Sequence, residues 1–127
     1  MPMRHFITLA LLLISLIHAL PLLGVLGAAR LSTLYGIAVT EPNLEILLRH
    51  RAVLFGMLAV FLAYAAFKPE LHTLALTGGL LSVLGFMALT MMVGNPNAAL
   101  QTVFKVDVAA LGLLLAAGAA HLRGSSP

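Results

Sequence analysis

The sequence predicts an all-α protein, a bundle of four transmembrane helices that forms a single membrane domain over residues 1–127. Hydrophobic residues make up 61% of the chain and charged residues only 9%, whereas a soluble domain carries roughly a quarter charged residues. Four apolar segments follow one another with short polar connections, at about residues 6–29, 43–67, 71–93 and 98–122. Each is long enough to cross the hydrocarbon core, which needs about 20 residues of helix. We therefore expect lipid to surround most of the chain.

The first predicted helix, residues 6–29, follows Arg4. Its apolar run is longer than the ~7–15 residues of a signal-peptide core, so we expect an uncleaved span. Pro21 lacks the N–H that would bond four residues back, which predicts a kink around residues 17–21. His18 lies near the middle of this span and is the intramembrane polar candidate.

His18 has two interpretations. A central ionisable group could relay protons or bind a metal or haem. A neutral imidazole bonded to a neighbouring hydroxyl, or to a carbonyl freed by Pro21, needs no function, and we favour this role. Haem is disfavoured because the other histidines fall near helix ends, and no metal or other cofactor is predicted. The chain has no cysteine, which excludes thiolate sites.

Residues 30–43 are too polar to cross a membrane and too apolar for a free linker. We expect an interfacial segment or re-entrant loop between the first two helices, with Tyr35 at headgroup level. The stretch Thr40-Glu41-Pro42-Asn43 supplies a capping residue and a proline suited to a first helical turn. The second helix should therefore begin near Asn43.

Two predicted helices carry stripes of small residues. On the second helix the stripe lies below Glu45 and Arg49 and consists of Ala52, Gly56, Ala59, Ala63 and Ala66; on the third it consists of Gly79, Ser82 and Gly85. Small side chains let helices approach closely in lipid, so these stripes are the predicted packing faces, and Glu45 and Arg49 are expected to belong to that of the second helix.

Six ionisable side chains near the starts of the second and fourth helices form the candidate site. They are Glu45, Arg49, His50, Arg51, Lys105 and Asp107. Counting ~20 residues back from Lys68 and from Arg123 gives the points where the second and fourth helices enter the membrane, both at the same face. Arg49, Arg51, Lys105 and Asp107 therefore lie at matching depths near that face. A charge at mid-membrane costs at least about 2.5–3.5 kcal/mol, so these groups should pair or face a wet cavity.

We predict that Asp107 accepts hydrogen bonds from Arg49 or Arg51, with Glu45 bonded to Arg49 four residues away. Arg51 points about 200° away from Arg49, so one partner cannot serve both. The cluster is either a structural element, locking helices together or snorkelling to headgroups, or a ligand- or proton-handling site. Its excess positive charge would suit an anionic or carbonyl-bearing ligand, such as a lipid headgroup or a quinone.

The layout resembles that of the DoxX-like group of small four-helix bacterial membrane proteins. The resemblance rests on Leu34-Tyr35-Gly36 before the second helix, Arg51-Ala-Val-Leu-Phe-Gly56 near its start, and the short polar turn before the fourth. It covers the whole chain in topology. It implies a bacterial inner-membrane location and, for some members, association with quinone-linked or redox-stress membrane complexes.

The favoured function is a non-enzymatic bundle that binds lipid, a partner membrane protein or further copies of itself. The alternatives are an accessory subunit of a quinone-linked redox system and a small transporter. The chain has no Gly-rich phosphate loop and no His-Glu-x-x-His, so no catalytic residue is assigned. Its Lys and Arg are spread singly, which argues against nucleic-acid binding.

The positive-inside rule predicts cytoplasmic termini. It places Arg4, Lys68 and Arg123 on the cytoplasmic side and Arg30 on the other, whereas counting Arg49, Arg51 and Lys105 with the extracytoplasmic loops would reverse this orientation.

Overall fold

The computed structural model describes residues 3–124, and every regular element in that range is helical. The α-helices are α1 (Met3–Ala19), α2 (Ala28–Tyr35), α3 (Pro42–Ala66), α4 (His72–Val93) and α5 (Ala98–Gly124), with short 3₁₀ helices η1 (Leu20–Leu26) and η2 (Pro69–Leu71). Four segments are long and apolar enough to cross a membrane: Met3–Leu26, Pro42–Ala66, Pro69–Val93 and Ala98–Gly124. The predicted all-α bundle with four candidate spans is confirmed.

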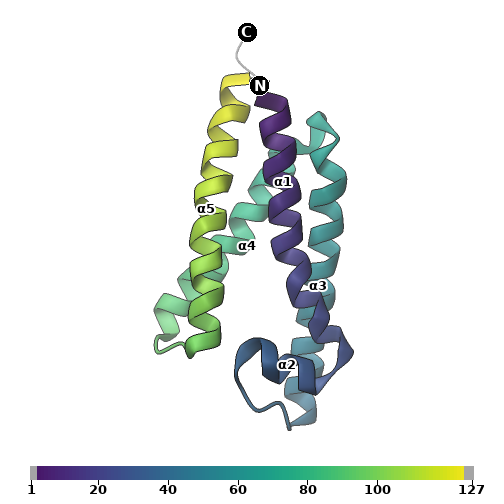
Figure 1. Cartoon of the computed structure of the whole chain (residues 1–127), viewed down its shortest axis with the longest axis vertical. Helices are drawn as coiled ribbons and strands as arrows, with labels where there is room; N and C mark the ends of the chain where they lie inside the picture. The colour runs from purple at the N-terminus through teal and green to yellow at the C-terminus, as the bar shows by residue number, and fades with distance from the viewer. Residues whose placement is uncertain (1–2, 125–127) are drawn as a thin grey trace.

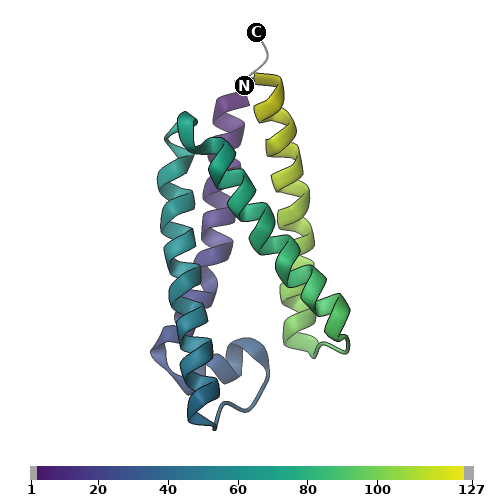
Figure 2. The same ribbon diagram turned by 180° about the vertical axis from the view of Figure 1, so that it is seen from behind.

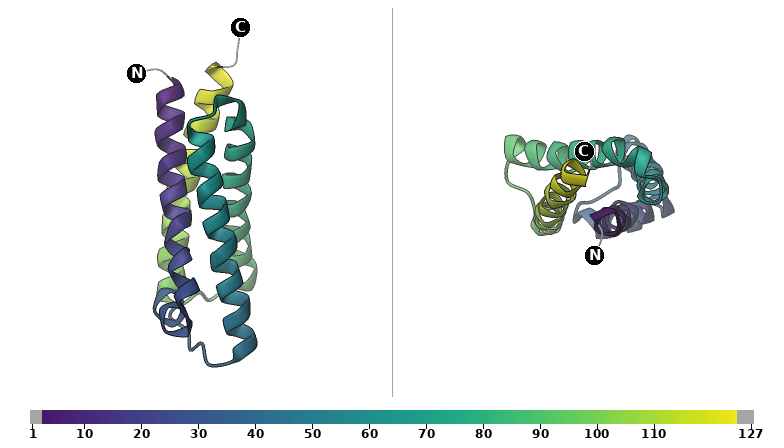
Figure 3. Two further views of the ribbon diagram at one scale, coloured as in Figure 1. Left: turned by 90° about the vertical axis from the view of Figure 1, so that its right-hand side faces the viewer. Right: turned by 90° about the horizontal axis from the view of Figure 1, so that it is seen from above.

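The four long helices run lengthwise, and the two ends of the described chain lie at the same end of the bundle (Figure 1). Helix α2 lies at the opposite end. Seen from behind, α4 meets α3 at the turn that joins them and then slants away from it toward α5 (Figure 2). The view from above shows the strong tilt of α4 relative to the other long helices (Figure 3). This divergence of α3 and α4 positions the cavities described below.

The first span changes from α-helix to 3₁₀ helix at the predicted kink. Helix α1 ends at Ala19 and the chain continues as η1, with Pro21 in its first turn. Proline cannot donate to the carbonyl four residues back, and a 3₁₀ turn is one way to accommodate that loss. The kink is therefore confirmed, and it brings η1 against α2 and α3.

The segment between the first two spans packs against the bundle, as expected, and contains α2. This helix ends at Gly36, whose φ of 65° lies in the left-handed region that favours glycine. Leu31 and Tyr35 of α2 are buried, with Leu48 of α3 and Leu100 of α5 against them. Tyr35, expected at headgroup level, is 7% exposed and faces the interior.

Glu41 caps the start of α3. Its carboxylate accepts hydrogen bonds from the backbone N–H groups of Asn43 at 3.0 Å and Leu44 at 2.9 Å. These two N–H groups, Asn43 first, hold the pKa of the exposed Glu41 carboxyl below its usual value. The helix begins at Pro42, one residue before the predicted start.

The small-residue stripe of α3 is its packing face against η1, at Ala52 and Gly56, and against α1, at Ala59 and Ala66. Ala52, Gly56, Ala59 and Ala66 are buried. Two α1 hydroxyls donate across this contact: Ser15 to the carbonyl of Ala59 at 2.7 Å and Thr8 to that of Ala66 at 2.8 Å. These bonds hold the two helices together where hydrophobic association gains little because lipid is itself apolar.

The stripe on α4 is only partly a packing face. Gly79 is buried beside Leu114 of α5 and Ile14 of α1, whereas a Cβ on Gly85 would meet nothing within 4 Å. Ser82 bonds to His18 instead. The expectation of close packing is thus correct at Gly79 and wrong at Gly85, because α4 has tilted away from its neighbours at that point.

Candidate functional site

The six residues of the predicted cluster divide into an outer and an inner group. Arg49 Nη1 donates to Glu45 Oε2 at 3.0 Å, which confirms that predicted pair. The pair lies at the surface, where Arg49 is 46% exposed, so the expectation that Glu45 and Arg49 belong to the packing face of α3 is wrong. His50 and Lys105 are also exposed. These four residues are typical of solvated or headgroup-facing charges, and such exposed pairs contribute little to stability.

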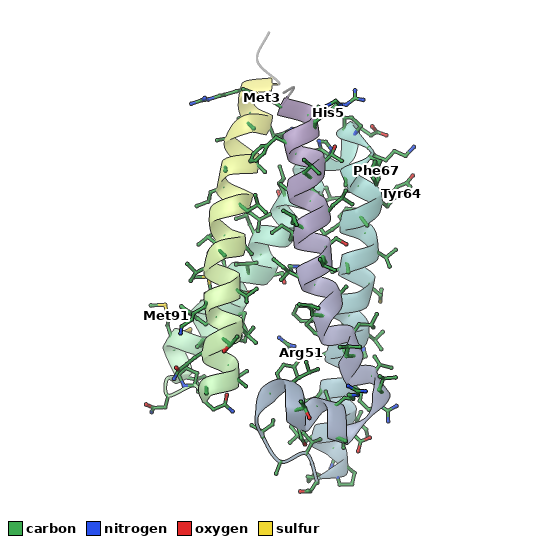
Figure 4. All side chains as sticks on the ribbon, in the orientation of Figure 1. Met3, His5, Arg51, Tyr64, Phe67 and Met91 are labelled. Carbon is green, nitrogen blue, oxygen red and sulfur yellow. The ribbon has the colours of Figure 1, made fainter. Side chains whose placement is uncertain are left out.

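Arg51 belongs to the inner group. It enters the space between the α1–α3 pair and α5, next to α2 (Figure 4). Its Nη1 donates to the Tyr35 hydroxyl at 2.5 Å, and its guanidinium lies 4.3 Å from the centroid of the Phe55 ring. A cation over an aromatic face is favourable, increasingly so away from water. Tyr35 and Phe55 therefore hold Arg51 inside the bundle.

Asp107 faces the same interior but does not bond to either arginine. Within residues 3–124 the one ion pair closer than 4.0 Å is that of Glu45 with Arg49, so the predicted Asp107 hydrogen bond is wrong. The reason lies in the packing. Helices α3 and α5 each pack against α1 and α4 and thus face each other across the bundle, while Arg51 is engaged by Tyr35 and Phe55.

Arg51 and Asp107 line one cavity of about 200 Å³. Each lies nine residues beyond the first residue of its helix, in line with the predicted matching depths. The other polar lining residues are His18, Tyr35, Ser82 and Thr102, and the apolar walls are Ile17, Leu20, Pro21, Leu34, Phe55, Phe86, Val103 and Val106. A mostly apolar pocket with a few convergent polar groups is the usual form of a small-molecule site.

His18 is buried in the wall of this cavity, 2% exposed. Its Nδ1 lies 2.9 Å from the carbonyl oxygen of Ile14 and its Nε2 lies 2.8 Å from the Ser82 hydroxyl. A carbonyl only accepts, so Nδ1 carries a proton, and the Nε2 of the neutral ring accepts from Ser82. The ring also stacks on Phe55 at 5.5 Å.

The predicted hydroxyl partner of His18 is thereby confirmed. The carbonyl belongs to Ile14 rather than to Ile17, whose oxygen Pro21 leaves without an N–H. Both ring nitrogens have protein partners. In the described part of the chain no three His, Cys, Asp or Glu side chains gather as a metal site would require.

A second cavity of about 530 Å³ adjoins the first at the end of the bundle away from the termini. Three residues line both cavities: Tyr35, Arg51 and Phe86. Asn97 closes this end. Its Oδ1 caps α5 by accepting from the Leu100 N–H at 2.8 Å, and its amide donates to the Tyr35 carbonyl at 2.7 Å.

Sequence reasoning missed Tyr35, Phe55, Ser82, Phe86 and Thr102 as lining residues. One signal was available, because Arg51 and Phe55 are four residues apart and thus share a helix face. Tyr35 could not have been assigned in this way, since its position depends on how α2 folds back against α3 and α5.

Comparisons of the chain with protein-family models, with curated proteins and with solved structures gave no match. The DoxX-like resemblance therefore stays a prediction, and the chemistry of the cavity carries the functional proposal.

Proposed function

We propose that this protein is a non-enzymatic membrane bundle that binds a lipid-soluble ligand with a carbonyl-bearing polar head. The observation that carries the proposal is the position of Arg51 at the wall of an interior cavity. Within residues 3–124 its guanidinium makes one side-chain hydrogen bond, to Tyr35. A guanidinium has five N–H donors, so others remain for a ligand carbonyl.

The charge balance of the cavity favours a neutral head over an anionic one. Asp107 accompanies Arg51 there, whereas Arg49 and Lys105 are exposed. One guanidinium and one carboxyl leave little excess positive charge for a phosphate. A neutral head can accept from Arg51 through a carbonyl, and a hydroxyl on it can donate to Asp107.

A purely structural lock is the competing role for these two residues. A lock would need Arg51 and Asp107 to bond directly across the bundle, and they instead flank an open volume. Protein interiors are close-packed, and an unfilled volume forfeits the dispersion contacts of its walls. Two polar side chains held apart around a cavity are better explained by a ligand between them.

The DoxX-like resemblance supports a bacterial inner-membrane location and makes a quinone the first candidate ligand. A role as an accessory subunit of a quinone-linked redox system would follow from such binding. Arg4, Lys68 and Arg123 lie toward the end of the bundle where the described chain begins and ends, and Arg30, Arg49 and Lys105 lie toward the end with α2. The cations that the positive-inside rule counts are thus balanced between the two ends, and the cavities lie near the end with α2.

Intrinsic fluorescence offers a direct binding test. The chain has two tyrosines and no tryptophan, and Tyr64 is exposed near the far end of α3. Tyr64→Phe leaves Tyr35 as the reporter. A short-chain 1,4-benzoquinone added to this variant in nanodiscs should quench Tyr35 saturably. Arg51→Gln should weaken that binding about tenfold or more, because a hydrogen bond to a charged group contributes about 1.5–3 kcal/mol.

Arg49→Gln is the matched control. It removes the same charge two residues away, but from the outer surface, and should change the affinity less than about twofold. Equal losses for Arg49→Gln and Arg51→Gln, or quenching that rises linearly with quinone in every variant, would refute binding in the cavity.

A further inference from the structure

We infer that the ligand is a single-chain amphiphile whose apolar chain leaves the inner cavity between α3 and α4 and lies in the adjoining 530 Å³ groove. This inference rests on the proposed function, because it assigns a second subsite to the same molecule. The polar head would stay beside Arg51, and the chain would lead from there to the bilayer.

The groove has walls suited to an alkyl or isoprenoid chain. Leu48 comes from α3, Leu89 and Val93 from α4, and Leu100 from α5. No charged side chain other than Arg51, which it shares with the inner cavity, lines it within residues 3–124. Two polar lining residues, Asn95 and Asn97, lie in the turn between α4 and α5, so the leucine and valine side chains are the part of the groove that would pack a hydrocarbon chain.

The groove adjoins the head site. Tyr35, Arg51 and Phe86 line both spaces, so these three side chains lie at the boundary that the ligand would cross. The inner cavity alone, about 200 Å³, is smaller than the ~300–1,000 Å³ typical of a ligand pocket. The small inner cavity and the larger groove therefore match a small polar head joined to a longer apolar chain.

The path out of the groove is lateral. Helices α3 and α4 diverge toward this end (Figure 2), and Leu89 and Val93 are 60% and 82% exposed on the face that lipid would cover. An apolar chain extending there meets acyl chains rather than water. A diacyl phospholipid fits less well, since it has two chains to place and a phosphate that Asp107, beside Arg51 in the inner cavity, does not favour.

The first test maps the two ends of one ligand. Two photoreactive analogues of a decyl-1,4-benzoquinone, one with a diazirine on the ring and one at the chain end, are cross-linked to the protein in phosphatidylcholine nanodiscs. We expect the ring label near Arg51 and Asp107 and the chain-end label near Leu48, Leu89 or Thr90. Unlabelled decylbenzoquinone should compete for both labels, whereas additional phosphatidylcholine should not.

The second test closes the groove. Thr90 lines the groove, and its hydroxyl donates to the Phe86 carbonyl of its own helix. In Thr90→Phe the added ring would occupy the space that the decyl chain needs, and forcing both into it is costly. Binding of the decyl compound should therefore weaken about tenfold. The affinity for the same benzoquinone without a chain should change less than about twofold. Ala88→Phe adds an identical ring at an exposed position of α4 outside the groove and should leave both affinities unchanged.

The outcomes separate this inference from the proposed function. A ring label inside the cavity together with a chain label scattered over exposed helix faces, or competition by phosphatidylcholine for the chain label, would overturn the groove assignment and leave the head site standing. Equal effects of Thr90→Phe and Ala88→Phe would overturn it too. A ring label outside the cavity would remove the proposed function, and this inference with it.

Discussion

Arg49 and Arg51 stand two residues apart on α3, and the periodicity of one helix gives them different chemistry. About 200° of rotation separates them, which puts Arg49 at the surface with Glu45 and Arg51 inside with Tyr35 and Phe55. The inward arginine is costly unless it is bonded or its cavity is filled. For this reason the proposed ligand site is assigned to Arg51 rather than to Arg49.

The hydrogen bond from Ser82 allows a test of how His18 is held. Ser82→Ala removes the hydroxyl bonded to Nε2, so we expect the free energy of unfolding to fall by about 1 kcal/mol. Denaturant unfolding in mixed micelles measures this loss. Thr77→Val on the same helix removes a hydroxyl bonded only within α4 and should stay within about 0.5 kcal/mol. Nitrogen-15 spectra of the wild type should show a proton on Nδ1 and none on Nε2; two protonated nitrogens would contradict the assigned tautomer.

At the residue scale, sequence reasoning predicted the depth correctly and the inward face wrongly. Counting from Lys68 and Arg123 placed Arg51 and Asp107 at matching depths, but the small-residue stripe assigned Arg49, not Arg51, to the packing face. Periodicity within one helix predicted the ion pair of Glu45 with Arg49. It could not predict that Arg51 would bond to Tyr35, because that contact depends on the fold of α2. A side chain's final partner is decided by the helices around it, which periodicity within one helix does not specify.

At the scale of elements, the start of α3 depends on the charge of Glu41. The lowered pKa means that the cap contributes fully above the usual pKa of about 4.3 and is lost as the pH falls through the lower value of the folded state. We expect the amides of Asn43 and Leu44 to exchange more slowly in the wild type than in Glu41→Ala at pH 6, and this difference to shrink toward pH 3. Hydrogen exchange compared at equal pH measures it.

Glu70→Ala provides the control for this titration. Glu70 is an exposed acid at the opposite end of α3, in η2, and should not alter protection at Asn43 or Leu44. A difference between wild type and Glu41→Ala that persisted unchanged at pH 3 would show that the ionised carboxylate is not what protects these amides.

Element boundaries were the part of the fold that the sequence predicted best. Hydropathy and the proline and asparagine residues at the helix starts placed α3, α4 and α5 within about two residues of their observed ends. Hydropathy did not divide the first span into α1 and η1, although Pro21 predicted the break. It also left α2 as an unspecified interfacial segment, because eight residues are too few for periodicity to prove a helix.

At the scale of the whole molecule, tight packing toward one end coexists with open volume at the other. Toward the termini, α1 lies against α3 and α5 through buried alanines, leucines and isoleucines. Toward α2, the tilt of α4 leaves the two cavities. The packed end can supply the rigidity that a binding site at the open end requires. The prediction of helix spans could not anticipate this asymmetry, since it arises from the tilt of one helix.

Two adjacent glycines of α4 test whether the packed end is as tight as its contacts indicate. A Cβ on Gly79 would lie 3.0 Å from Cδ2 of Leu114, and Leu114 is fully buried, which leaves its side chain little room to withdraw. A Cβ on Gly78 would meet only Leu58, at 4.0 Å. Gly78→Ala should be neutral or stabilise the helix by up to about 1 kcal/mol, whereas Gly79→Ala adds an overpacking cost of about 1–3 kcal/mol.

We therefore expect Gly79→Ala to unfold more easily than Gly78→Ala by about 1–3 kcal/mol, as measured by denaturant titration in the same micelles. Because Gly78 and Gly79 line neither cavity, the benzoquinone affinity of the folded protein should be preserved in both variants. Equal stabilities for the two variants would mean that Leu114 can yield, and that α4 moves more freely against α5 than a rigid support for the cavity would allow.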